Sequence, residues 1–143
     1  MEKILEKYGY TLTDDAIAST IESVKANLGN WKTKEVYSDC LGMVDLTTLN
    51  GTDTPTKVKS LVEKVNKAKE KYPDAPYPAS ICVYPNFSKT IKDNLTAEGV
   101  HITVVSGCFR ASQSYLEVKV LESKMAVENG ANEVDIVLAH NAF

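Results

Sequence analysis

Asp135 carries the strongest chemical signal in the sequence. It lies in the apolar run 133–138, which has the pattern of a buried strand, because Val134, Ile136 and Val137 flank it. Burying an unpaired carboxylate costs free energy, so a carboxylate at such a position suggests a catalytic purpose. A structural ion pair inside the fold is the alternative, and the residues themselves leave both interpretations open.

Three other side chains could bind a substrate. Asp45 and Thr47 follow the apolar run 41–44, where a carboxylate and a hydroxyl could order a polyol or a water molecule. Turn and cap chemistry would also select these two residue types. Cys82 lies inside a second apolar run, where a small buried hydrophobic residue is its commoner role. By themselves these three residues do not establish a binding site.

The histidines and cysteines do not indicate a metal site. His101 and His140 lie far apart in the sequence and have no neighbours at metal-ligand spacing. The three cysteines, Cys40, Cys82 and Cys108, are an odd number without such spacing. Reduced thiols in a cytoplasm fit this pattern best, so we expect no bound metal and a cytoplasmic location.

The composition is that of an ordinary globular domain. Of the 143 residues, 43% are hydrophobic and 24% are charged, which is enough apolar material for a core. The net charge of -3 comes from 16 basic and 19 acidic residues spread along the chain. We therefore expect no nucleic-acid partner and no membrane partner. Residues 1–7 interleave charges with apolar residues, which is not typical of a secretory signal.

Strand and helix patterns alternate along the chain and must position these side chains. Apolar residues recur at helical spacing over 13–28. Short apolar runs predict four strands, over 41–44, 79–84, 100–105 and 133–138. Helical patterns lie between them. This alternation predicts a parallel sheet with right-handed crossovers.

Cap residues predict where the helices begin and end. Thr13 and Thr54 each precede a helical pattern, and Pro55 suits a first turn. Ser88 is the expected cap of a short helix, and Ser114 has capping-box spacing ahead of the last one. Two glycines, Gly99 and Gly130, stand where helices are expected to terminate.

The turn after the first strand distinguishes two parallel folds. A nucleotide-binding open sheet has a glycine-rich turn there, but residues 45–51 read DLTTLNG. Polar residues at strand ends instead suit the carboxyl-terminal face of a TIM-type barrel. We predict an α/β fold made of about the first four strands of a parallel β/α barrel over 37–143, preceded by a helical lead-in over 1–36.

Four strands are half of a closed barrel, which typically takes about 250 residues. Two parallel sheet edges would then be unpaired, and inward side chains such as Val44, Ile81 and Val104 would lack an opposite wall. We therefore expect the chain to form a homo-oligomer or to pair with a complementing carboxyl-terminal half.

Three motifs, in order, resemble deoxyribose-phosphate aldolase. They are VDLTTLN at 44–50, SICVYP at 80–85 and GANEVDIV at 130–137. The resemblance covers about residues 40–143 and implies a class I aldolase. Such enzymes interconvert deoxyribose phosphate with acetaldehyde and glyceraldehyde phosphate through a lysine Schiff base. It also implies a phosphosugar ligand, no metal and no cofactor.

By matching position, the resemblance implies a role for each candidate residue. Asp135 would be the carboxylate of the proton relay, and Asp45, Thr47 and Cys82 would line the substrate pocket. The reactive lysine of the family, and the second cation that lowers its pKa, belong to strands beyond Phe143. The chain alone is therefore expected to be inactive.

One loop departs from the family pattern, and two rival functions remain. Residues 106–110 read SGCFR, where the family usually has a phenylalanine-proline pair and then a glycine. The first rival is a non-catalytic half-barrel that assembles with itself. The second is a small phosphosugar- or nucleotide-binding α/β module, which is supported only by the alternation of strands and helices.

Overall fold

A computed structural model describes residues 7–9 and 13–142 of the chain. The chain divides into two compact units between Tyr37 and Ser38. The stretch 1–7, for which no targeting signal is predicted, lies outside the described residues except for Lys7. A domain boundary after residue 36 stays a prediction.

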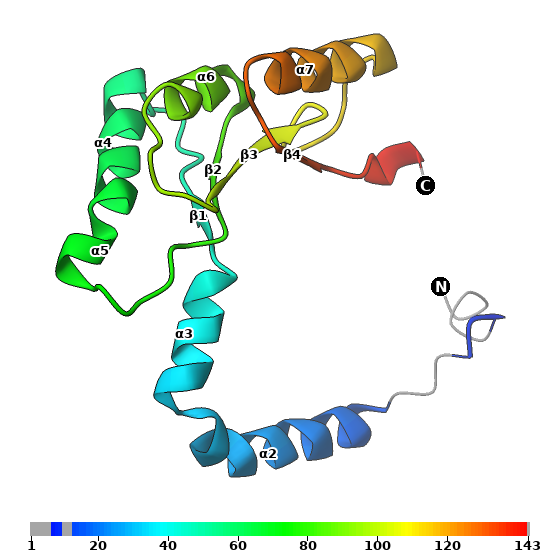
Figure 1. Cartoon of the computed structure of the whole chain (residues 1–143). Coiled ribbons are helices and arrows are strands. Elements are labelled where there is room, and N and C mark those ends of the chain that lie inside the picture. Colours follow the sequence, from blue (N-terminus) through cyan, green and yellow to red (C-terminus); the bar gives the residue numbers. More distant parts are fainter. Residues whose placement is uncertain (1–6, 10–12, 143) are drawn as a thin grey trace. The chain divides into compact units, whose positions relative to one another are not determined.

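The first unit contains the long helix α2 (Asp14–Trp31) (Figure 1). Thr13 is its N-cap, as predicted, and the Thr13 hydroxyl accepts a hydrogen bond from the amide of Ala16 at 3.2 Å. The predicted helical pattern is thereby confirmed, and the helix continues three residues past Leu28. No helix in the described part of the chain is both long enough and apolar enough to cross a membrane.

The second unit contains a parallel sheet of four strands in the order β1-β2-β3-β4 (Figure 1). Its strands are β1 (Asp45–Thr47), β2 (Ser80–Val83), β3 (His101–Ser106) and β4 (Glu133–Ile136). Each strand pairs in parallel with the next one along the chain. The predicted parallel sheet is confirmed, and β1 and β4 form its two edges.

The first strand exists, but its predicted bounds, 41–44, are wrong, because β1 begins at Asp45. Helix α3 (Lys34–Gly42) runs through the first half of this stretch. The amides of Met43 and Val44 then donate to the carbonyls of Asp39 and Leu41, which extends the helical hydrogen bonding to the start of β1. A four-residue apolar run fits the end of a helix as well as a strand, so periodicity could not separate the two.

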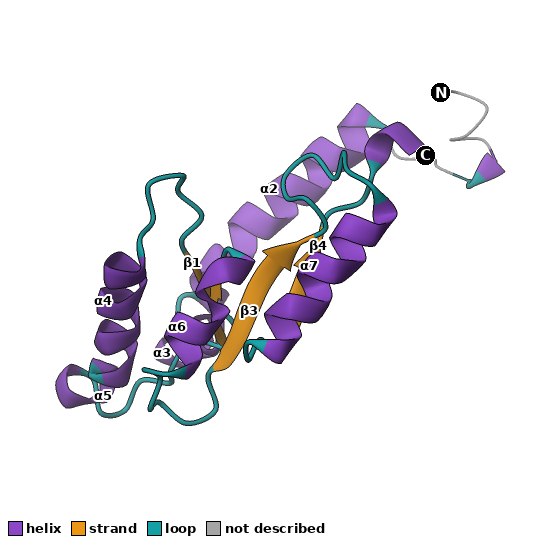
Figure 2. Cartoon of the chain, turned by 90° about the horizontal axis from the view of Figure 1, so that it is seen from above, coloured by secondary structure: helices purple, strands orange, loops and turns teal. Residues whose placement is uncertain are grey.

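Helices lie along one side of the sheet (Figure 1, Figure 2). They are α4 (Pro55–Asn66), α5 (Ala68–Lys71), the 3-10 turn η1 (Pro85–Phe87), α6 (Ser88–Lys92) and α7 (Leu116–Glu128), and a second 3-10 turn, η2 (His140–Ala142), ends the described part. The apolar core forms between these helices and the sheet, with Val58 and Val62 from α4 and Ile91 from α6.

Two side chains predicted to face an open barrel interior lie in this core instead. Ile81 and Val104 are fully buried and belong to the same cluster as the helix residues. Because side chains alternate along a strand, the neighbours of Ile81 and Val104 in sequence face the other side. The prediction that these two lack cover is therefore wrong, whereas Val44, just before β1, is exposed.

Local signals fixed some helix ends correctly. The Thr54 hydroxyl accepts from the amide of Lys57 at 3.3 Å and caps α4. Gly130 follows α7 with φ +107°, and the amide of Ala131 donates to the carbonyl of Ala126 at 3.0 Å. This is a Schellman closure, as expected of a terminating glycine.

Other cap predictions were wrong. Ser88 is the first residue of α6 rather than its cap, and its hydroxyl donates back to the carbonyl of Pro85 at 2.9 Å. Helix α7 begins at Leu116, so Tyr115 and not Ser114 stands at the cap position. Gly99 has the expected positive φ but lies in the turn before β3, seven residues after the end of α6.

Candidate active site

The register of the sheet brings all four predicted site residues to one face. Asp45 pairs with Ser80, Thr47 with Cys82, and Cys82 with Thr103. Thr103 pairs in turn with Glu133, two residues before Asp135. Paired residues of parallel strands point the same way, as do residues two apart in one strand. Asp45, Thr47, Cys82 and Asp135 therefore share the face opposite the helices.

Asp45 is held in place from the neighbouring strand. The buried Ser80 hydroxyl donates to Asp45 Oδ1 at 2.6 Å. The Thr47 hydroxyl donates to the backbone carbonyl of Asp45 at 2.9 Å. Asp45 and Thr47 make up most of the three-residue strand β1 rather than the loop after it. The arrangement fixes one carboxylate oxygen, and Asp45 itself is exposed on this face.

Cys82 is buried in the centre of this face, with 4% of its surface exposed. Burial raises the pKa of its thiol, a hydrogen bond with Thr47 lowers it, and the negative charges of Asp135 and Asp45 raise it further. The thiol is therefore protonated at neutral pH and is a poor nucleophile. This agrees with the interpretation of Cys82 as a small buried side chain.

Asp135 is exposed, so the prediction of a buried carboxylate is wrong. Its strand, β4, lies at the edge of the sheet and has a neighbour on one side only. Among the residues that the structure describes, no ion pair includes Asp135, so the alternative of a structural ion pair finds no support there. The Asp135 carboxylate is therefore open to solvent on the face that it shares with Asp45 and Cys82.

Glu133, His101 and Thr103 form a hydrogen-bonded trio on the same face, which the sequence did not predict. Glu133 Oε1 lies 2.6 Å from His101 Nδ1, and Glu133 Oε2 accepts from the Thr103 hydroxyl at 2.7 Å. The Thr103 hydrogen bond and then the contacts with His101 lower the pKa of Glu133. Glu133 lies two residues before Asp135 in the same predicted strand, and residues two apart share a face, so this spacing could have identified Glu133 from the sequence. Both Glu133 and His101 are the first residues of their strands.

Three loops meet at the carboxyl ends of the strands. The Tyr84 hydroxyl, after β2, donates to the carbonyl of Leu49, after β1, at 3.4 Å. The ring of Tyr84 also packs edge-on against Phe109, after β3, with centroids 6.5 Å apart. These contacts place an aromatic pair at the end of the sheet where barrel enzymes carry their chemistry.

The loop that departs from the family pattern is held by α7. Glu122 Oε2 accepts from the amide of Cys108 and from the Ser106 hydroxyl, both at 3.1 Å. Gly107 and Cys108 have positive φ values of +72° and +62°. Glu122 thus anchors the loop from outside the polar face.

Asp53 organises the loop after β1 and was missed from the sequence. Its carboxylate accepts from the Thr48 hydroxyl at 2.8 Å and the Asn50 amide at 3.0 Å, and it pairs with Lys57 Nζ at 2.6 Å. The hydrogen bond with Lys57 is the main cause that lowers the pKa of Asp53 to about 2. The signal that could have identified Asp53 is a carboxylate that follows two polar turn residues, Asn50 and Thr48, by three and five positions.

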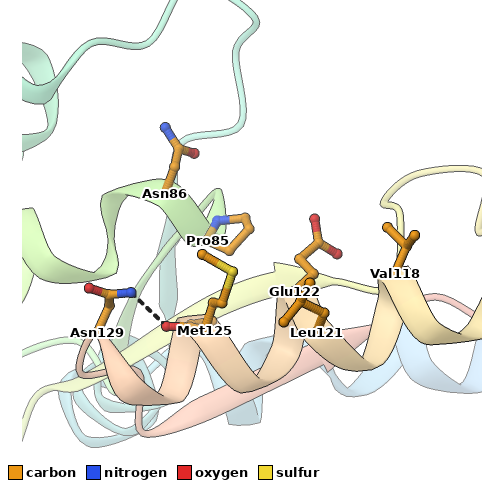
Figure 3. A pocket seen from close by; sticks show the side chains of 8 residues that line it. Pro85, Asn86, Val118, Leu121, Glu122, Met125 and Asn129 are labelled. Carbon is orange, nitrogen blue, oxygen red and sulfur yellow. Dashed lines mark hydrogen bonds between the residues drawn. The ribbon is translucent and has the colours of Figure 1, made fainter.

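A cavity of about 310 Å³ lies apart from the polar face, between η1 and α7. Val118, Leu121 and Met125 of α7 face Pro85 across it (Figure 3). Its lining is mostly apolar and contains none of the predicted site residues. Within the described ranges, no group of three histidine, cysteine, aspartate or glutamate residues could hold a metal ion, and His140 lies in η2.

Two of three comparisons with known proteins find deoxyribose-phosphate aldolases. No family model matches the chain. A protein of Caenorhabditis elegans, provisionally named deoxyribose-phosphate aldolase, is 33% identical over 133 residues, which are 92% of this chain and 44% of that protein. The chain therefore spans less than half the length of this relative.

Solved structures give the same match. A provisionally named deoxyribose-phosphate aldolase from Coccidioides immitis aligns with a TM-score of 0.61 and 26% identity, over 73% of this chain and 38% of that one. The tetrameric deoxyribose phosphate aldolase from Aeropyrum pernix aligns with a TM-score of 0.61 and 27% identity, over 73% and 41%. In sequence and fold the chain is deoxyribose-phosphate aldolase-like, and its four parallel strands align with part of that family's barrel.

Proposed function

We propose that the chain is the amino-terminal part of a deoxyribose-phosphate aldolase, which cleaves deoxyribose phosphate reversibly to acetaldehyde and glyceraldehyde phosphate. The observation that supports this most is the shared face of Asp45, Thr47, Cys82 and Asp135, because these residues come from three separate motifs and lie on one face of the sheet. The similarity over 92% of the chain supports it as well.

Each residue has a role that suits its surroundings. Asp135, an exposed carboxylate, relays protons to and from the reacting carbon. Asp45, oriented by Ser80, accepts hydrogen bonds from substrate hydroxyls beside Thr47. Cys82 supplies a small neutral wall, since its raised pKa keeps the thiol protonated. The reaction needs no metal and no cofactor.

The nucleophile comes from another part of the barrel. The four strands read DLT, SICV, HITVVS and EVDI, and none contains lysine. A Schiff base requires a deprotonated lysine amine. We infer that the chain works only with the remaining strands, as a continuation or as a complementing polypeptide, and that it does so in the cytoplasm.

Complementation tests this proposal. The chain would be mixed with a separately expressed carboxyl-terminal part of the Caenorhabditis elegans relative, and cleavage of deoxyribose 5-phosphate would be measured with borohydride trapping and mass spectrometry. We expect activity only in the mixture, with the trapped adduct on the added part. Asp135→Asn should abolish it, whereas Asp93→Asn, at an exposed position beside Lys89, should not. A stable but inactive mixture would reject the proposal, and an adduct on the chain itself would reject the inference about lysine.

A self-assembling, non-catalytic half-barrel is the second candidate. The observation that favours it is the apolar edge of the sheet, where Ile136 is 68% and Leu138 58% exposed. Such side chains usually mark an interface. A stable homo-oligomer in sedimentation experiments, inactive when the complementing part is added, would favour this candidate.

A further inference from the structure

The loop after β3, residues 107–112, has an unusual backbone. Cys108 and Ser112 are not glycines, yet their φ values are +62° and +55°. Left-handed φ values are unfavourable for residues with a Cβ, so they persist only where surrounding contacts hold them. The loop also carries Phe109, whose ring packs edge-on against Tyr84. The contacts that hold the loop therefore also determine where this aromatic pair lies.

Three side chains on one face of α7 hold the loop. Lys119, Glu122 and Ser123 are spaced by three and four residues, which makes them neighbours on a helix. The buried Ser106 hydroxyl donates to Glu122 Oε2 at 3.1 Å and lies 2.8 Å from the Ser123 hydroxyl. At the far end of the loop, Lys119 Nζ donates to the buried Ser112 hydroxyl at 2.9 Å. Both ends of the loop are thus attached to the same helix.

Glu122 makes the contact that reaches the left-handed part of the loop. Besides the Ser106 hydroxyl, its Oε2 atom accepts from the amide of Cys108 at 3.1 Å. The carbonyl of Cys108 accepts in turn from the amide of Ser112 at 2.8 Å. Cys108 is therefore fixed through both of its backbone polar groups, directly before Phe109. Hydrogen bonds to a carboxylate are stronger than neutral ones, so the loss of Glu122 should release the loop at this point.

We propose that Glu122 is a positioning residue of the candidate aldolase site. It holds the loop after β3 so that Phe109 lies against Tyr84 and forms part of the wall around the substrate. This aromatic pair lies at the carboxyl ends of the strands, where barrel enzymes bind their substrates. The effect on the substrate rests on the proposed function, whereas the position of the loop can be measured without it.

The loop is tested first in the 143-residue chain alone. The Cys108 thiol is half-buried in the loop, so its alkylation by iodoacetamide, followed by mass spectrometry of peptides, reports on loop opening. Glu122→Ala should speed this alkylation about tenfold or more, because opening no longer breaks a charge-assisted hydrogen bond. Glu122→Gln should stay close to the parent, because it removes the charge but keeps an acceptor oxygen. Glu117→Ala, at an exposed position of α7, is the control and should match the parent.

The substrate wall is tested in the mixture with the carboxyl-terminal part of the Caenorhabditis elegans relative. Glu122→Ala should raise the KM for deoxyribose 5-phosphate about tenfold and change kcat by less than about threefold, because binding is weakened and the reacting groups are untouched. Glu122→Gln should restore the parent KM. A purely structural defect would instead reduce the amount of active enzyme, which lowers the apparent kcat and leaves KM unchanged.

Lys119→Ala is the second variant, in case circular dichroism shows that Glu122→Ala does not fold. It releases the loop at Ser112, so the Cys108 alkylation rate and KM should both rise, whereas Lys124→Ala on the same helix should change neither. Unchanged Cys108 alkylation in the folded variants, or faster alkylation with an unchanged KM, would overturn the inference. An inactive parent mixture would reject the proposed function, and the Cys108 rates would then decide whether Glu122 positions the loop.

Discussion

The Ser80 hydroxyl donates to Asp45 Oδ1 at 2.6 Å and joins the first two strands through their side chains. Ser80 is fully buried on the face that also carries Cys82 and Asp135. The contact therefore couples the stability of the sheet edge to the orientation of a candidate substrate-binding carboxylate.

Ser80→Ala should lower the free energy of unfolding by about 1–3 kcal/mol, because the Asp45 carboxylate loses its donor. Urea unfolding followed by circular dichroism measures this. Ser60→Ala, at an exposed position of α4, is the matched control and should change stability by less than about 0.5 kcal/mol. Equal effects of the two substitutions would contradict the importance of the Asp45 contact.

Asp53 should make stability depend on acid pH. Its pKa is about 2 in the folded chain, against an ordinary value of 3.8. The stabilisation is therefore fully present above pH 3.8 and is lost as the pH falls through about 2, because the unfolded chain binds the proton first. Urea unfolding of Asp53→Asn between pH 6 and 2 should show a flatter decline than the parent.

The matched control for Asp53 is Asp93→Asn, which removes an exposed carboxylate paired with Lys89. Exposed pairs of this kind contribute little to stability. Its acid dependence should follow the parent chain. If Asp53→Asn also followed the parent, the loop after β1 would not be held by this carboxylate.

Gly130→Ala should destabilise the chain by about 1–2 kcal/mol, because φ +107° is unfavourable for a residue with a Cβ. The added Cβ would also meet the side chain of Lys92. Thermal unfolding measures the effect. Gly51→Ala, where a Cβ meets nothing within 4 Å and φ is not positive, should be close to neutral. A neutral Gly130→Ala would show that the end of α7 adjusts without cost.

Thiol alkylation should separate the cysteines. Cys40 is exposed, whereas Cys82 is buried and has a raised pKa. Iodoacetamide at pH 8 should therefore modify Cys40 quickly and Cys82 only after urea is added, as mass spectrometry of peptides would show. Cys82→Ser should leave the rate at Cys40 unchanged. Rapid alkylation of Cys82 in the folded chain would contradict its burial.

Local signals predicted the order of the elements well, and boundaries less well. The run at 79–84 was identified as a strand, and β2 forms within it. The run at 41–44 was assigned wrongly, because Leu41 and Gly42 complete a helix whose hydrogen bonds depend on residues earlier in the chain. The cap at Thr54 could be predicted because it involves only the first turn of α4, whereas the start of α7 at Leu116 depends on the loop before it.

By itself, the sequence determined the alternation of strands and helices, the parallel sheet and the resemblance carried by the motifs around Asp45, Cys82 and Asp135. These follow from residue type and short-range periodicity. Only the tertiary structure decided which side chains share a face, because that depends on the register between strands distant in sequence. It also decided that Ile81 is buried beneath helices while Asp135 is exposed, because burial depends on which neighbours each strand has in the sheet.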